Sequence, residues 1–176
     1  MQLIWRDVAI GDGKPINTSL TSDETAELQR LAKDAEVLEI GSAYGYSTCA
    51  LALVAKSVVA IDPHFTHGSE GALNANLTAY GVRDKVDIRV GYSQAVLPQL
   101  TEGTFDMVWV DGDHVAETVE HDVRWAMRLL KPGGVLACHD YAETTCPGVK
   151  HALDKVFGGP GELTDTLAVY VGPVSS

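Results

Sequence analysis

Three aspartates stand where apolar stretches of the chain end. Asp62 ends a run that starts at Ser57, Asp111 ends one that starts at Phe105, and Asp140 follows His139 at the end of a third. Carboxylate oxygens are the ligands that Mg²⁺ prefers, and an imidazole also admits Mn²⁺ or Fe²⁺. If the second and third of these strand ends are neighbours in a sheet, Asp111, His139 and Asp140 form a divalent-cation site.

A second candidate site is a glycine-containing turn. An apolar stretch over 37–40 runs into Gly41 and Gly45, and a helix-like run follows. Glycines at such a turn let the backbone bend sharply and let a ligand approach, while the first N–H groups of the helix point at that ligand. Seventeen residues beyond Gly45 comes Asp62, the position at which an acid in a βαβ unit binds ribose hydroxyls. The pattern predicts a site for a nucleoside cofactor.

The glycine spacing indicates which nucleoside cofactor binds. The dinucleotide fingerprint G-x-G-x-x-G is absent, because Gly41 and Gly45 are four residues apart. Glu39, two residues before Gly41, would repel a pyrophosphate but suits a cationic or amino-bearing ligand. The segment 39–47 resembles the E/D-x-G-x-x-x-G motif of class I S-adenosylmethionine-dependent methyltransferases, and especially the catechol and caffeoyl-CoA O-methyltransferase group.

Later segments extend this resemblance in order from about residue 36 to 141. The stretch 90–94 is similar to the segment whose Ser-Gln pair contacts adenine, 105–111 is similar to the fourth strand, and 130–134 is similar to the turn before strand five. The resemblance implies S-adenosylmethionine as cofactor. It implies these cofactor-binding residues: Glu39, Gly41, Ser42, Ala43, Gly45, Tyr46, Ser47, Asp62, Ser93, Gln94 and Asp111.

The resemblance also implies the metal ligands. In the family, a metal is held by the acid that ends strand four and by two adjacent residues that end strand five, which correspond here to Asp111, His139 and Asp140. The family usually has an acid in place of His139. We therefore expect Mg²⁺ or Mn²⁺, with two alternatives open. Asp111 could instead cap the following helix, and His139 with Asp140 could be a hydrogen-bonded pair at the start of a loop.

Asp113 and His114 are the candidates for the catalytic base. Asp113 lies two residues beyond Asp111, so an extended loop points both side chains to the same side. Related sugar-modifying O-methyltransferases have an acid at this position, and the catechol group has a lysine at the position of His114. A neutral histidine has a suitable pKa for accepting a proton. A capping or solvent-facing role is the alternative for both.

The elements that position these residues alternate along the chain. We expect a helix after the capping box of Thr21 and Glu24, an α/β core, and a closing hairpin over 162–171. The predicted strands are 36–40, 57–62, 85–90, 106–111 and 134–140; the predicted helices are 46–55, 69–80, 93–100, 115–130 and 147–157. The resemblance implies a Rossmann-like, doubly wound, mostly parallel seven-stranded sheet with an antiparallel last strand.

Length and composition limit the function further. The 176 residues predict a single methyltransferase domain over 1–176, with an irregular segment over 1–20 and the Rossmann-like core over 21–176. The net charge of −11 argues against nucleic acid and anionic membranes as partners. No signal peptide or membrane-length apolar run is evident, and three cysteines without pairing motifs are typical of a cytoplasmic protein.

The function predicted from the sequence is metal-dependent O-methylation of a small hydroxylated molecule. The alternatives are a metal-independent methyltransferase, an NAD(P)-dependent oxidoreductase and a catalytically silent cofactor-binding protein. We expect residues 1–20 and the loop 142–146 to line the acceptor pocket. Because the N-terminal segment is shorter than in the catechol group, the site is either open or completed by a second subunit in a homo-oligomer.

Overall fold

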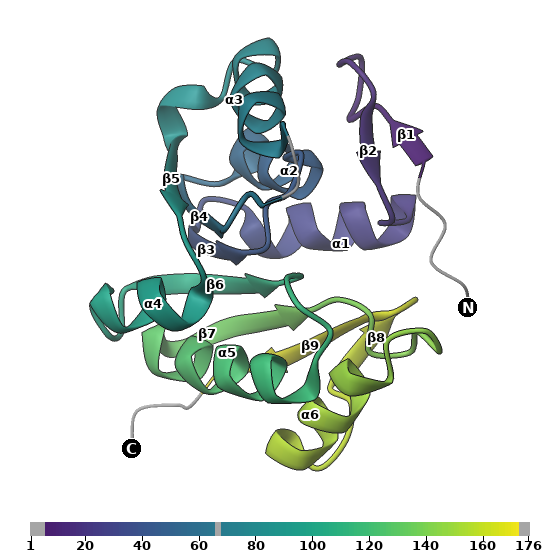
Figure 1. The fold of residues 1–176 in the computed structure, drawn as a ribbon, viewed down its shortest axis with the longest axis vertical. Coiled ribbons are helices and arrows are strands. Elements are labelled where there is room, and N and C mark those ends of the chain that lie inside the picture. The colour runs from purple at the N-terminus through teal and green to yellow at the C-terminus, as the bar shows by residue number, and fades with distance from the viewer. Residues whose placement is uncertain (1–5, 66–67, 173–176) are drawn as a thin grey trace.

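A twisted seven-stranded sheet organises the computed structural model, which describes residues 6–65 and 68–172 (Figure 1). The strand order is β5-β4-β3-β6-β7-β9-β8. Every pairing from β5 to β7 is parallel, and β9 pairs antiparallel with both β7 and β8. The strands are β3 (Glu36–Ile40), β4 (Ser57–Asp62), β5 (Val86–Val90), β6 (Phe105–Val110), β7 (Leu130–Cys138), β8 (Glu162–Thr164) and β9 (Leu167–Val171). The predicted fold class is confirmed.

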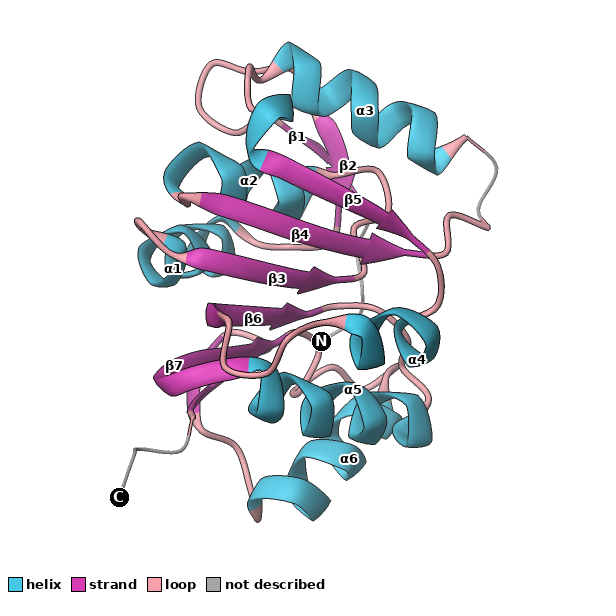
Figure 2. Cartoon of the chain, turned by 90° about the vertical axis from the view of Figure 1, so that its left-hand side faces the viewer, coloured by secondary structure: helices cyan, strands magenta, loops and turns pink. Residues whose placement is uncertain are grey.

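Helices cover both faces of the sheet (Figure 2). They are α1 (Ser22–Ala32), α2 (Tyr46–Val54), α3 (Ser69–Ala79), α4 (Ser93–Val96), α5 (Ala116–Leu129) and α6 (Pro147–Phe157), with short 3₁₀ turns η1 (Arg83–Lys85) and η2 (Leu97–Gln99). Side chains of α1, α2 and α3 pack into one core cluster, and those of α5 and α6 pack into another. None of the helices within the described ranges is long and apolar enough to cross a membrane.

The inner strands feed both clusters because successive strand residues point to opposite faces. In β3, Val37 belongs to the first cluster and Leu38 to the second; in β6, Trp109 belongs to the first and Val108 to the second. These strands are therefore apolar on both sides, which is typical of parallel strands. Polar residues that follow their carboxyl ends are the first side chains free to face a ligand.

The N-terminal segment is a small hairpin, so the prediction of irregular structure over 1–20 is wrong for its described part. Strands β1 (Arg6–Val8) and β2 (Ile16–Thr18) pair antiparallel, while residues 1–5 lie outside the described residues. Tyr80 fixes the connection by accepting a hydrogen bond from the Ile10 N–H and donating one to the Lys14 carbonyl. Strands of three residues show too little alternation to be recognised in the sequence.

The fifth predicted strand begins earlier and ends earlier than expected. Strand β7 starts at Leu130, so the predicted turn over 130–134 lies inside the strand as an irregularity, where the register with β6 shifts and Gly133 has φ +75°. The strand ends at Cys138, and β6 ends at Val110. Asp111, His139 and Asp140 therefore lie just beyond two neighbouring strands, where their side chains meet.

Candidate active site

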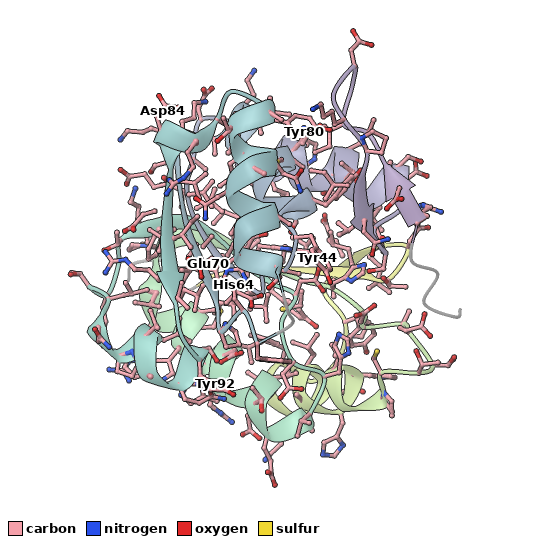
Figure 3. The ribbon with its side chains drawn as sticks, turned by 45° about the horizontal axis from the view of Figure 1, so that its top comes forward. Tyr44, His64, Glu70, Tyr80, Asp84 and Tyr92 are labelled. Carbon is pink, nitrogen blue, oxygen red and sulfur yellow. The ribbon has the colours of Figure 1, made fainter. Side chains whose placement is uncertain are left out.

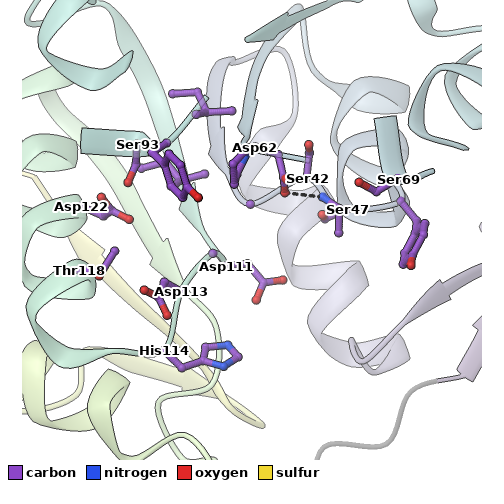
Figure 4. A pocket seen from close by; sticks show the side chains of 18 of the residues that line it. Ser42, Ser47, Asp62, Ser69, Ser93, Asp111, Asp113, His114, Thr118 and Asp122 are labelled. Carbon is purple, nitrogen blue, oxygen red and sulfur yellow. Dashed lines mark hydrogen bonds between the residues drawn. The ribbon is translucent and has the colours of Figure 1, made fainter. Parts of the chain in front are cut away.

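A cavity of about 740 Å³ lies at the carboxyl ends of the parallel strands (Figure 4). Most residues proposed from the sequence line it: Gly41, Ser42, Ala43, Gly45, Tyr46, Ser47, Asp62, Ser93, Gln94, Asp111, Asp113, His114 and Asp140. The wall also includes Asn17 to Leu20 of the N-terminal segment. Glu39 and His139 do not line the cavity.

Two glycines shape the turn after β3. Gly41 has φ +96°, and a Cβ on it would lie 2.2 Å from the carbonyl oxygen of Asp111. Gly45 has φ +90° and precedes the first residue of α2; its N–H donates to the Ser42 carbonyl at 2.7 Å. A side chain at Gly41 would force apart the loops after β3 and β6. The close approach of these loops brings the glycine turn next to Asp111.

Glu39 lies beneath this turn and is fully buried. Its Oε1 accepts a hydrogen bond from the Ser47 hydroxyl at 2.5 Å, whereas Oε2 has no hydrogen-bond partner among the described residues. Burial raises the pKa of Glu39 to about 8. Glu39 is linked to the cavity by Ser47, which donates a hydrogen bond to Glu39 and lines the cavity wall.

Asp62 connects the end of β4 to the glycine turn. One carboxylate oxygen accepts the Ala43 N–H at 2.8 Å (Figure 4), and the other accepts the His64 N–H at 2.7 Å. Each carboxylate oxygen has more than one acceptor site. Asp62 therefore orders the turn and keeps acceptor capacity in the wall of the cavity. His64 turns away toward α3, where its Nδ1 lies 3.0 Å from the Ser69 hydroxyl (Figure 3).

The structure brings together the three residues expected to bind a metal. The Nδ1 atom of His139 lies 3.2 Å from an oxygen of Asp111 and 3.3 Å from an oxygen of Asp140, yet it makes no hydrogen bond of good geometry. His139 is buried, and its Nε2 lies 3.3 Å from Glu24. Burial acts to lower the pKa of His139, but the charges of these three carboxylates raise it well above its usual value.

Sequence reasoning missed the role of Glu24 at this site. Glu24 forms the predicted capping box of α1 with Thr21, so its side chain has a local explanation in the sequence. The same carboxylate also accepts hydrogen bonds from the backbone N–H and hydroxyl of Thr166, at 2.8 and 2.6 Å. Glu24 and His139 are 115 positions apart, and no local sequence pattern predicts such a contact.

The two candidate bases, Asp113 and His114, are adjacent on the loop after β6 but have different surroundings. His114 lies with Nε2 2.9 Å from Asp140 and Nδ1 3.3 Å from the Cys146 sulfur. The bond to Asp140 raises the pKa of His114. Asp113 is exposed and accepts the Val115 N–H at 3.2 Å, which is a turn within the loop and not a helix cap, because Val115 is the N-cap of α5 and no side chain caps that helix. Cys146 was not foreseen as a partner, because its contact with His114 spans 32 residues.

The expected wall over 142–146 lies elsewhere. None of these residues lines the main cavity; Ala142, Glu143 and Thr144 line a separate hollow of about 480 Å³ with Tyr141 and Lys150. The loop reaches the site through Cys146, which contacts His114. The N-terminal hairpin is therefore the nearer candidate for contact with an acceptor.

A doubly wound sheet with a glycine turn and an acid at its strand ends is the arrangement of Rossmann-like domains. A family model described as a methyltransferase domain matches residues 38–141. The chain belongs to this methyltransferase family.

Individual relatives agree with the family and differ in their acceptors. A catechol O-methyltransferase of Mycobacterium tuberculosis is 32% identical over 146 residues, which are 72% of this chain and 64% of the relative. A protein-L-isoaspartate O-methyltransferase of Nitrosospira multiformis is also 32% identical, over 71% of this chain and 49% of its own length. The chain thus spans about half to two-thirds of these curated relatives.

A solved structure supports the same fold. A cofactor-bound protein from MTB superimposes with a TM-score of 0.76 at 26% identity, covering 89% of this chain and 82% of that one.

Proposed function

We propose that this protein is an S-adenosylmethionine-dependent methyltransferase that methylates a hydroxyl group of a small molecule. The observation that carries the proposal is the cavity in which Gly41, Gly45 and Asp62 meet Ser93 at the strand ends, within a methyltransferase family. Asp62 would bind the ribose hydroxyls, and Ser93 with Gln94 would lie at the adenine. The glycine turn leaves room for the methionine portion of the cofactor beside Asp111.

A divalent metal, Mg²⁺ or Mn²⁺, fits the residues beyond β6 and β7. Asp111, His139 and Asp140 offer three ligand atoms within 4.8 Å of one another. The buried, unbonded Nδ1 of His139 faces both carboxylates, while Nε2 is directed at Glu24. Metal-binding histidines typically donate their other ring N–H to a carboxylate in this way. A metal there would lower the pKa of the acceptor hydroxyl and orient its oxygen. A metal-independent transferase remains the alternative.

His114 is the base that the geometry favours. When its Nε2–H donates to Asp140, the lone pair lies on Nδ1, whose described neighbour is the weak partner Cys146. That nitrogen could accept the proton of the acceptor hydroxyl, while Asp140 fixes the ring. Asp113 also lines the cavity, but its carboxylate already accepts the Val115 N–H in the loop before α5. Asp113 is therefore the second candidate.

Calorimetry and a methyl-transfer assay test the proposed function. S-adenosylmethionine should bind, whereas NADH should not. Labelled methyl groups should pass to one or more members of a panel of phenols, polyols and glycosides. A parallel panel of isoaspartyl peptides covers the acceptor of the second relative. Binding of NADH without S-adenosylmethionine would favour an oxidoreductase, and cofactor binding without transfer to any acceptor would favour a silent binding protein.

Two further proposals come from the sequence. We propose that the protein is cytoplasmic, and that it forms a homo-oligomer in which a second subunit completes an open site. The three cysteines are free and buried, which suits a reducing compartment. Sedimentation of the purified protein with and without cofactor tests the assembly.

A further inference from the structure

Cys146, His114 and Asp140 form a cluster that the proposed methyl transfer uses only in part. The Cys146 sulfur lies 3.3 Å from Nδ1 of His114, and Nε2 of the same ring lies 2.9 Å from Asp140. The sulfur, a ring nitrogen and a carboxylate oxygen all lie within 4.8 Å of one another. The thiol has no part in the proposed reaction, so its place beside the proposed base needs an explanation.

The fold holds the thiol beside this ring. Cys146 is the N-cap of α6, and its side chain makes no capping hydrogen bond to that helix. Gly148, in the first turn of α6, lets the loop after β6 approach, since a Cβ there would lie 2.2 Å from the His114 carbonyl oxygen. Among the described residues, the other hydrogen-bond contact of the sulfur is the Thr145 hydroxyl at 3.9 Å. The backbone therefore directs a nearly unused sulfur at His114.

A thiol in this position suits a metal ion better than a substrate. Cys146 is 4% exposed and lines neither the main cavity nor the hollow beside Tyr141. A bulky molecule therefore does not reach the sulfur for nucleophilic attack. His114 does line the main cavity, and its side chain is 40% exposed (Figure 4). A single ion can enter past the ring, where a larger molecule is excluded.

The donor atoms match zinc rather than magnesium. Thiolate and imidazole are ligands of Zn²⁺, whereas Mg²⁺ takes oxygen ligands. Zn–S and Zn–N bonds of about 2.3 and 2.0 Å at a tetrahedral angle place the two ligand atoms about 3.5 Å apart. The 3.3 Å between Cys146 Sγ and His114 Nδ1 is close to this separation. Asp140 at Nε2 is the carboxylate that typically orients a metal-binding imidazole.

This cluster is distinct from the oxygen-rich group at Asp111. Oδ1 of Asp140 lies 3.3 Å from Nδ1 of His139, whereas Oδ2 lies 2.9 Å from Nε2 of His114. Asp140 therefore stands between two sets of donors. One set consists of carboxylates with His139, and the other contains a sulfur.

We propose that Zn²⁺ binds between Cys146 and His114, with Asp140 orienting the ring and water in the remaining positions, and that zinc bound there inhibits methyl transfer. The thiol proton leaves to solvent as the sulfur binds the ion. Zinc then occupies the lone pair of His114 Nδ1, the proposed acceptor of the substrate proton. The inhibition rests on the proposed function, whereas the binding of zinc does not.

Titration with Co²⁺, a spectroscopic substitute for Zn²⁺, tests the site in excess Mg²⁺, which occupies oxygen ligands. The wild-type protein should develop a thiolate-to-cobalt charge-transfer absorption that Zn²⁺ abolishes, and Cys146→Ser should lack it. Cys146→Ser and His114→Ala should each weaken Zn²⁺ binding by more than about 10–100-fold, the usual cost of losing only an outer partner of a ligand. Cys49→Ala and His151→Ala are matched controls that should bind as the wild type does, since Cys49 is a buried thiol of α2 and His151 an exposed imidazole of α6.

Three spectroscopic results would overturn the inference. They are absence of the absorption in the folded wild-type protein, its persistence in Cys146→Ser, and its loss in Cys49→Ala, which would assign the thiolate to another site. Thermal unfolding of the metal-free variants identifies loss of folding, in which case His114→Ala decides, because its side chain is partly exposed.

The methyl-transfer assay separates this inference from the proposed function. In excess Mg²⁺, Zn²⁺ should inhibit the wild-type protein, and Cys146→Ser should resist that inhibition. Zinc binding at Cys146 without methyl transfer to any acceptor would leave the zinc site standing and count against the proposed function. Methyl transfer that bound zinc does not slow would overturn the inhibition.

Discussion

Single side chains in this site serve the fold and the ligand at once. Asp62 orders the glycine turn through the Ala43 N–H, and His139 is enclosed by Glu24, Asp111 and Asp140. The sequence predicts a cofactor contact for Asp62 and a metal contact for His139. Both side chains nevertheless have protein partners within hydrogen-bond or ion-pair distance. Substitutions here therefore need controls that separate loss of order from loss of a ligand contact.

Asp62→Ala should weaken S-adenosylmethionine binding by about 2–5 kcal/mol, because it removes the ribose acceptor and loosens the turn. Isothermal titration calorimetry measures the change. Asp87→Ala, an exposed residue of β5 paired with Arg89, should leave the affinity unchanged. Equal affinities in the Asp62→Ala and wild-type proteins would remove Asp62 from the cofactor site.

His114→Ala should lower kcat by about 10²–10⁴-fold, the usual contribution of a general base. The pH–rate profile should also lose its acidic limb, which is displaced to higher pH because the hydrogen bond to Asp140 raises the pKa of His114. Steady-state kinetics across pH provide the measurement, with Asp113→Asn as the comparison. If only Asp113→Asn lowers kcat, the base is Asp113.

At the scale of elements, the sequence predicted most helices and strands because their apolar patterns are local. The order of the strands came from the family resemblance. The hairpin of β1 and β2, the irregularity inside β7 and the contact of Glu24 with His139 were not predicted. Each of these depends on partners distant in the chain or on strands too short to show a period, so no local pattern encodes it.

Gly41→Ala should strongly destabilise the protein, since a Cβ would meet the Asp111 backbone at 2.2 Å in a left-handed conformation. Urea denaturation measures the free energy of unfolding. Gly71→Ala is the control: Gly71 lies inside α3 with open space around it, and alanine there should stabilise by about 0.5–1 kcal/mol. Equal stability of Gly41→Ala and wild type would show that the two loops separate easily.

The proposed metal site would join α1 to the ends of β6 and β7. Asp111→Asn should reduce the affinity for Mn²⁺, because it removes an anionic ligand. Glu24→Gln should reduce it about 10–100-fold by removing the negative charge of the carboxylate that faces His139. Titration with Mn²⁺, followed by electron paramagnetic resonance, measures this affinity. Asp113→Asn should bind Mn²⁺ as the wild type does; full turnover after exhaustive chelation would establish the metal-independent alternative.

Across the whole molecule, stability should depend on pH through Glu39. Its folded pKa of about 8 exceeds the ordinary value of 4.5, so the folded state holds a proton that the unfolded chain releases. Stability is then full below about pH 4.5 and falls as pH rises through 8. Glu39→Gln should remove this decline, which thermal unfolding between pH 5 and 9 measures. A parallel decline in Glu39→Gln would assign it to another group.

The junction of Glu24 with Thr166 and His139 has a consequence for biosynthesis. Glu24 leaves the ribosome early, whereas Thr166 is made 142 residues later. Until the β8–β9 turn emerges, the carboxylate of α1 lacks that partner, and β7 lacks the strand that covers its edge. Contacts of such separation form late. A nascent chain should therefore become resistant to proteolysis abruptly, after its last strand is free, rather than gradually as each βα unit is synthesised.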